Sequence, residues 1–170
     1  MNFSLSITHM SANSTHLQQK SPNCTRELHH WKGFERLSGL DSLEVLYLDG
    51  NKFDNSILSS LGGLSSLRTL SLDDNQLKGA ISVDELNNLT SLRSLAFGGN
   101  EIESFKSIHD TGDDLLRLRN MEYLGLNGNR FNDSALSSLK GLSSLKSLDI
   151  AYNQLKGSFN VTGNLTFFDS

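Results

Sequence analysis

Five asparagines recur along this chain at nearly equal intervals, and an asparagine amide can both donate and accept hydrogen bonds. Successive members are 24, 25, 29 and 24 residues apart: Asn51, Asn75, Asn100, Asn129 and Asn153. Amides at such a spacing can satisfy backbone polar groups wherever the chain turns beside its own core. We therefore predict that these five side chains form a structural ladder, with one rung in each turn of the chain.

Residues suited to catalysis or metal binding form no comparable pattern. His29 and His30 are adjacent but have no Cys or acidic neighbour at metal-ligand spacing, so we interpret them as surface residues. The segment 109–114 holds one His and three Asp, which could bind a cation but are also typical of a solvated loop. The sequence shows no phosphate-binding glycine loop and no nucleophile motif. We predict no catalytic residue, no metal site and no cofactor, and hence a protein that is not an enzyme.

Leucines at fixed positions before each asparagine indicate the elements that hold the ladder. The pattern is L-x-x-L-x-L-x-x-N-x-L/F, and its copies begin at Leu43, Leu67, Leu92, Met121 and Leu145. The second and third leucines are two residues apart, so they share one face of a short strand. This period and pattern are typical of leucine-rich repeats. We predict an α/β solenoid, a leucine-rich-repeat horseshoe of five repeats of about 24 residues with a parallel β-sheet on its concave face.

Length and charge are those of one acidic domain of 170 residues, with a net charge of −4 and a pI of about 5.7. That charge argues against a global basic surface for nucleic acid, and no apolar run is long enough for a transmembrane helix. Residues 1–30 lack the repeat and are predicted to be a disordered or loosely packed leader. We expect the repeat array in 31–157, a partial sixth turn in 158–170, and a bulging loop in Glu103–Leu115, where one interval is longer.

The residues between the strand leucines point away from the core and are predicted to line the concave face. They vary from repeat to repeat, and they carry three basic and six acidic side chains. Aromatic and Arg residues dominate interface energetics, and acidic residues would steer a partner that has a basic patch. The predicted partner-binding residues are Tyr47, Arg68, Asp73, Arg93, Tyr123 and Lys146. The alternative for each is an ordinary solvated position on a strand.

Three stretches resemble the ectodomains of plant leucine-rich-repeat receptor-like proteins. They read GFERLSGLDSLEVLYLDGNKFDNSILSSLGGLSSLRTLSLDDNQLKG, ELNNLTSL and SSLKSLDIAYNQLKGSF, within Trp31–Ser170. The resemblance implies an extracellular module without a kinase domain, which binds a protein or peptide ligand, and also a co-receptor, in defence or developmental signalling. The plant G-x-I-P element is present in altered form, as Gly79–Ser82 and Gly157–Asn160.

The resemblance places the chain at the extracellular face of the plasma membrane, although we find no signal peptide, transmembrane helix or paired-cysteine cap in it. N-glycosylation sequons agree with an extracellular origin. The candidate sites in or after the repeats are Asn88, Asn132, Asn160 and Asn164. Two alternatives stay open: a truncated fragment that binds nothing by itself, and an intracellular leucine-rich-repeat scaffold.

Overall fold

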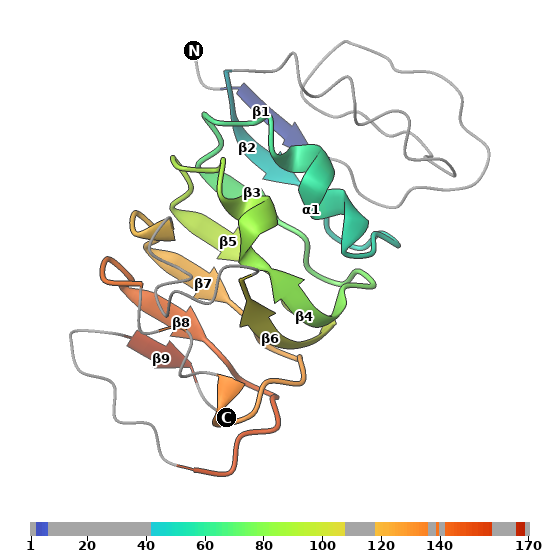
Figure 1. Cartoon of the computed structure of the whole chain (residues 1–170), viewed down its shortest axis with the longest axis vertical. Helices are drawn as coiled ribbons and strands as arrows, with labels where there is room; N and C mark the ends of the chain where they lie inside the picture. The colour runs from blue at the N-terminus through green and yellow to red at the C-terminus, as the bar shows by residue number, and fades with distance from the viewer. Residues whose placement is uncertain are drawn as a thin grey trace.

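The main element of the structure, a computed structural model, is a parallel sheet of seven strands in the order β1-β2-β3-β5-β7-β8-β9 (Figure 1). The structure describes residues 3–6, 42–107, 118–135, 139, 142–157 and 166–168. The strands of the sheet are β1 Phe3–Ser6, β2 Leu43–Tyr47, β3 Thr69–Ser71, β5 Ser94–Ala96, β7 Tyr123–Gly125, β8 Ser147–Asp149 and β9 Thr166–Phe168. The inner strands come from successive turns of the chain, which therefore winds as a solenoid.

Identical positions of the repeat meet across the sheet. Leu46 pairs with Leu70, Leu70 with Leu95, and Leu95 with the corresponding leucine of β7. Each of these leucines is almost fully buried, because no single turn can enclose its own apolar residues and its neighbours must cover them. The predicted leucine-rich-repeat solenoid with a parallel sheet is confirmed. The horseshoe curvature and the number of five repeats stay predictions.

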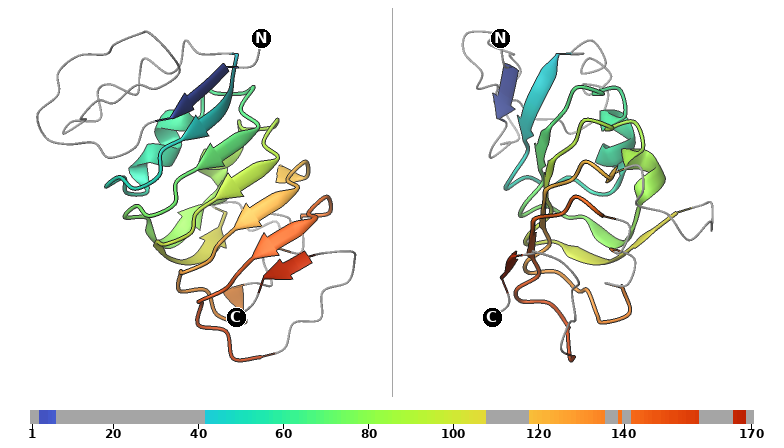
Figure 2. Two further views of the ribbon diagram at one scale, coloured as in Figure 1. Left: turned by 180° about the vertical axis from the view of Figure 1, so that it is seen from behind. Right: turned by 90° about the vertical axis from the view of Figure 1, so that its left-hand side faces the viewer.

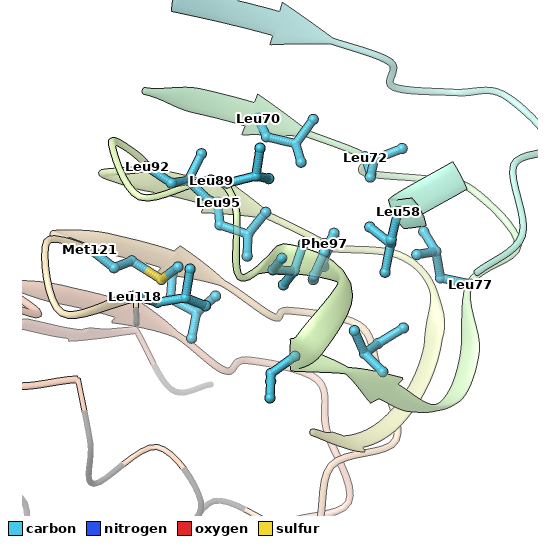
Figure 3. Close-up of a cluster of buried hydrophobic side chains, with 14 of the residues drawn as sticks. Leu58, Leu70, Leu72, Leu77, Leu89, Leu92, Leu95, Phe97, Leu118 and Met121 are labelled. Carbon is cyan, nitrogen blue, oxygen red and sulfur yellow. The ribbon is translucent and has the colours of Figure 1, made fainter. Parts of the chain in front are cut away.

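The core fills one side of the sheet only. Helix α1, Ser56–Leu61, and the 3-10 helix η2, Val83–Leu86, lie on that side, behind the strands (Figure 2). Figure 3 shows Leu58 of α1 directed into the same cluster as Leu72 and Leu95, which come from the sheet side. The opposite side of the sheet carries the residues that alternate with these leucines, and we call it the open face.

A second, two-stranded parallel sheet lies on the core side and was not predicted. It pairs β4, Lys78–Ser82, with β6, Glu101–Lys106. The predicted loop Glu103–Leu115 is therefore wrong at residues 103–106, which continue strand β6. The reason is burial: Phe105 is only 8% exposed, and its ring centroid lies 5.5 Å from that of Phe131. Residues 108–115 of the predicted loop lie outside the described residues.

Two strands fall in the flanking segments. Strand β1 lies within the predicted leader 1–30 and pairs in parallel with β2, a contact that the sequence analysis did not predict. Strand β9 lies within 158–170 and pairs in parallel with β8. The remaining residues of both segments lie outside the described part of the chain. The seven-stranded sheet thus extends beyond the repeats on both sides.

Candidate partner-binding site

The recurring asparagines lie just beyond the ends of the strands, and four of the five link their repeat to the one before it. Asn100 Nδ2 lies 3.0 Å from the carbonyl oxygens of Phe97, in its own repeat, and of Leu72, in the preceding one. Its Oδ1 accepts a hydrogen bond from the backbone N–H of Leu77 at 3.1 Å. The equivalent three contacts recur at Asn75, Asn129 and Asn153. Asn51 donates to its own repeat, to Leu48 O at 2.8 Å.

Charged side chains at the N-terminal ends of the strands pair with one another. The Glu122 carboxylate lies between two cations, 2.8 Å from Arg93 Nη1 and 2.6 Å from Lys146 Nζ. The hydrogen bond from Lys146 is the main reason that the pKa of Glu122 is lowered. Arg68 Nε lies 3.9 Å from a carboxylate oxygen of Glu44. We call this row of five residues the paired edge of the open face.

The C-terminal ends of the same strands carry carboxylates without cations. Asp49, Asp73, Asp74 and Asp149 have no Lys or Arg nitrogen within ion-pair distance in the described part of the chain. We call this second row the carboxylate edge. The open face is therefore electrically asymmetric, because its basic residues are neutralised at one edge while negative charge remains unbalanced at the other.

Asp73 is the most constrained member of the carboxylate edge. Its Oδ1 accepts a hydrogen bond from Gly98 N at 2.6 Å, and its own N–H donates to Asp49 Oδ1 at 3.1 Å. Burial of the side chain is the main cause that raises the pKa of Asp73 from 3.8 to about 6. The bond from Gly98 opposes that rise, and the charges of Asp49, Asp74 and Asp149 add to it. Burial, followed by Asp149 and Asp73, likewise raises the pKa of Tyr123.

Two adjacent glycines form the floor between the carboxylates and the next repeat. A Cβ atom at Gly98 would lie 2.5 Å from Asn127 Oδ1, and one at Gly99 would lie closer still to Asp74 Oδ1. Both distances are far shorter than a van der Waals contact. Asp74 from the preceding repeat and Asn127 from the following one can therefore lie over these two residues only because glycine has no Cβ atom.

The structure brings the predicted partner-binding residues into two groups. Arg93 and Lys146 meet through Glu122 at the paired edge, where Arg68 lies beside Glu44. Asp73 and Tyr123 are close enough for the charge of Asp73 to affect the pKa of the phenol. Tyr47 stands apart on β2 and is 39% exposed.

Sequence reasoning left three residues of the open face out of the predicted set. Tyr152 is 75% exposed and adopts a left-handed backbone conformation, with φ 57°. Ser71 is almost fully buried on β3, and Asn127 leans over the glycine floor. Tyr152 occupies the position that is a left-handed glycine in three other repeats.

Two candidate glycosylation sites fall among the described residues, and both are exposed. Asn88 follows η2, and Asn132 lies in the loop after Phe131. Asn132 Oδ1 accepts hydrogen bonds from Ser134 Oγ at 2.7 Å and Ala135 N at 3.0 Å. Neither asparagine belongs to a strand of the open face. Asn160 and Asn164 lie outside the described residues.

The part of the chain that the structure describes contains no group of three His, Cys, Asp or Glu side chains arranged to hold a metal ion. Within that same part, none of the helices has the length and apolar character needed to cross a bilayer.

Comparison with family models agrees with the geometry of the repeats. Residues 42–64 match a model described as Leucine Rich Repeat, and residues 141–158 match a second one with the same description. The chain carries leucine-rich repeats. Both matches fall within the array, around β2 with α1 and around β8.

Known proteins that resemble this chain include plant receptors. It is 30% identical over 136 residues to Cuscuta receptor 1 of Solanum lycopersicum, a match that covers 74% of this chain and 12% of that receptor. The crystal structure of a TDR receptor is 28% identical with a TM-score of 0.62, over 79% of this chain and 23% of that one. The plant peptide hormone receptor RGFR1 in complex with RGF2 shares the fold, at 18% identity and a TM-score of 0.54, over 74% and 19% of the two chains. This leucine-rich-repeat chain thus spans only a small part of the receptors that it resembles.

Proposed function

We propose that this leucine-rich-repeat chain is a non-catalytic binding module whose open face recognises a protein or peptide. One observation carries the proposal. The exposed large apolar side chains of the described residues are Tyr47 and Tyr152, and both lie on the strands and turns of the open face. Aromatic residues are costly to expose and are enriched where proteins bind one another.

The charge pattern of the open face supports the same proposal. A paired edge and a carboxylate edge at opposite ends of the strands would give a partner a fixed orientation, because complementary charges set register as well as association rate. The resemblance to plant receptors also supports an extracellular setting, in which a ligand and a co-receptor are the partners. We include in the proposal that the chain is a segment of a receptor-like ectodomain in defence or developmental signalling.

A random peptide library displayed on phage can test the face without a known ligand. Peptides selected on the parent protein should bind Tyr123→Ala and Arg93→Ala at least about tenfold more weakly, because central aromatic and Arg residues contribute most to interfaces. Ser59→Ala is the matched control, since this exposed residue belongs to α1 on the core side. Selected peptides that bind both open-face variants as they bind the parent, and lose binding to variants in 103–115, would show that the site lies elsewhere.

A further inference from the structure

Within the described part of the chain, no cation pairs with the carboxylate edge. The exposed Asp74 carboxylate makes no hydrogen bond or ion pair with the described residues, and Asp73 uses only its Oδ1, toward Gly98 N. The basic residues of the open face belong to the paired edge, at the other end of the strands, where carboxylates already bind them. Unpaired carboxylates that are held close to one another are a site for a cation from outside the chain.

A buried hydroxyl lies on the same side of the sheet as Asp73. Ser71 alternates on β3 with the core residues Leu70 and Leu72, so it faces the open side, two residues before Asp73. It is only 6% exposed, and its hydroxyl forms no hydrogen bond with the described residues. Buried hydroxyls are nearly always satisfied. A donor or acceptor seated beside Asp73 would provide the missing bond.

The polar groups of this region favour a cation that can donate several hydrogen bonds. Asp74 from one repeat presents a carboxylate oxygen over Gly99, and Asn127 from another presents its side-chain amide over Gly98. A guanidinium group is planar, carries five N–H donors and binds carboxylates in pairs of parallel hydrogen bonds. A lysine ammonium group would offer a point charge and would use fewer of these oxygens.

We infer that the carboxylate edge over Gly98 and Gly99 binds an arginine side chain of the partner, held by Asp73 and Asp74. This inference rests on the proposed function and deepens it, because it names the residue type that a bound peptide inserts at one position. The raised pKa of Asp73 agrees with it, since a half-buried carboxylate without a cation is harder to ionise.

Titration with defined peptides, followed by NMR of the labelled whole chain, tests the arginine site directly. The probe is acetyl-Gly-Gly-Arg-Gly-Gly-amide, and its counterparts carry citrulline, which is neutral, or lysine in place of arginine. The arginine peptide should shift the amide signals of Ser71, Gly98 and Gly99 saturably. The citrulline peptide should bind about tenfold or more weakly, since loss of charge removes the ionic contacts, and the lysine peptide should bind several-fold more weakly.

Variants locate the site within the face. Asp73→Asn and Asp74→Asn should each weaken arginine binding about threefold to tenfold, and Asn at position 73 can still accept the bond from Gly98 N. Glu103→Gln is the control, because it removes an equal charge from an exposed position of strand β6 and should leave binding unchanged. The NMR spectrum of each variant reports at the same time whether it is folded.

The results separate this inference from the broader proposal. Equal affinity for arginine and citrulline peptides, or for the parent and both Asp variants, would overturn the arginine site. Equal affinity for arginine and lysine would overturn its guanidinium selectivity. Phage-selected peptides that need Tyr123 but neither Asp would leave the proposed function standing while the arginine site fails. Selected peptides that ignore the open face altogether would refute the proposed function itself.

Discussion

At the residue scale, four of the ladder asparagines join the turn of their own repeat to the turn before it: Asn75, Asn100, Asn129 and Asn153. Asn100 is 7% exposed and uses both ends of its amide, with three carbonyl oxygens around Nδ2 and one N–H at Oδ1. Asn is the shortest side chain that offers two N–H donors together with a carbonyl acceptor. Buried backbone groups of two repeats therefore depend on one side chain.

Replacing that amide should cost stability. Asn100→Ala should lower the free energy of unfolding by about 1–3 kcal/mol, because buried backbone groups lose their hydrogen-bond partner. Urea unfolding followed by circular dichroism measures the effect. Asn120→Ala is the control, since Asn120 is exposed and donates a single bond, to Thr90 O at 3.0 Å. Equal urea midpoints for the Asn100 variant and the parent would contradict a structural role of the ladder.

Asp73 should make stability depend on pH in the unusual direction. Its pKa in the folded protein is about 6, above the ordinary value of 3.8, so the folded state holds the proton more tightly than the unfolded state does. Stability from this group is therefore fully present at low pH and is lost as pH rises from about 3.8 to about 6. Asp73→Asn should be more stable than the parent at neutral pH and similar to it at about pH 3.5.

Urea midpoints of the two proteins at both pH values measure this effect, which solvent screening will reduce because the carboxylate is only half-buried. Glu103→Gln is the control, an exposed strand residue whose replacement should leave the pH dependence as in the parent. If the urea midpoints of the Asp73 variant and the parent change by the same amount between the two pH values, then the raised pKa of Asp73 does not control the pH dependence of stability.

At the element scale, a left-handed residue follows each strand of the repeats and lets the chain turn toward the ladder. Gly50, Gly99 and Gly128 have φ between 62° and 65°, and Asp74 and Tyr152 adopt φ of 54° and 57° at the equivalent position. Backbone hydrogen bonds continue between repeats here, as from Gly99 N to Asn127 O at 2.8 Å. The turn thus extends the sheet past its strands and carries the carboxylate edge.

Alanine substitutions at two glycines with nearly equal φ can distinguish two contributions to the loss of stability. One is the strain of a left-handed backbone, and the other is the clash of the new Cβ atom with a neighbouring side chain. Gly79→Ala, at φ 64° with no atom within 4 Å of its Cβ, should cost about 1 kcal/mol for the left-handed conformation alone. Gly99→Ala has the same conformation but also displaces Asp74, so it should cost more. Urea midpoints of the two variants provide the comparison. A Gly99 variant no less stable than the Gly79 variant would mean that Asp74 moves aside freely.

At the scale of the whole molecule, one continuous cluster of buried side chains runs through all the repeats, from Leu43 to Ile150. Each turn is covered by its neighbours, as Leu95 is by the strands on either side. Stability in such an array is the sum of the repeats and the contacts between them. The repeats of this short array should therefore unfold together.

A cavity in the central repeat tests that cooperativity. Leu95 is fully buried, so Leu95→Ala should lower the free energy of unfolding by about 2–5 kcal/mol. Leu155→Ala should cost less, because Leu155 is only partly buried against the core. Hydrogen exchange at β2 and at β8 should speed up together in the Leu95 variant. Faster exchange at β2 while β8 keeps its protection would show that the two ends unfold separately.

The sequence alone determined the repeating part of this protein. Leucine spacing predicted the strands, the face that their leucines share and their parallel order. The register follows from the repeat itself, because equivalent positions of successive turns lie side by side. The asparagine spacing likewise predicted which amides lie beyond the strand ends. The prediction of a solenoid with a parallel sheet succeeded because most contacts in a solenoid join neighbouring turns, and a periodic sequence gives the same contacts to each turn.

Only the tertiary structure decided what breaks the period. Phe105 joins strand β6 because Phe131 and β4 lie beside it, and residues 3–6 pair with β2 from outside the repeats. The division of the open face into a paired edge and a carboxylate edge also needs distances across the sheet, because the sequence does not state which cations Glu122 contacts. Which side chains of neighbouring repeats meet depends on how far each side chain extends over the next strand. Asn127, for example, extends over Gly98 because that residue has no Cβ atom, and only the folded structure places the two together.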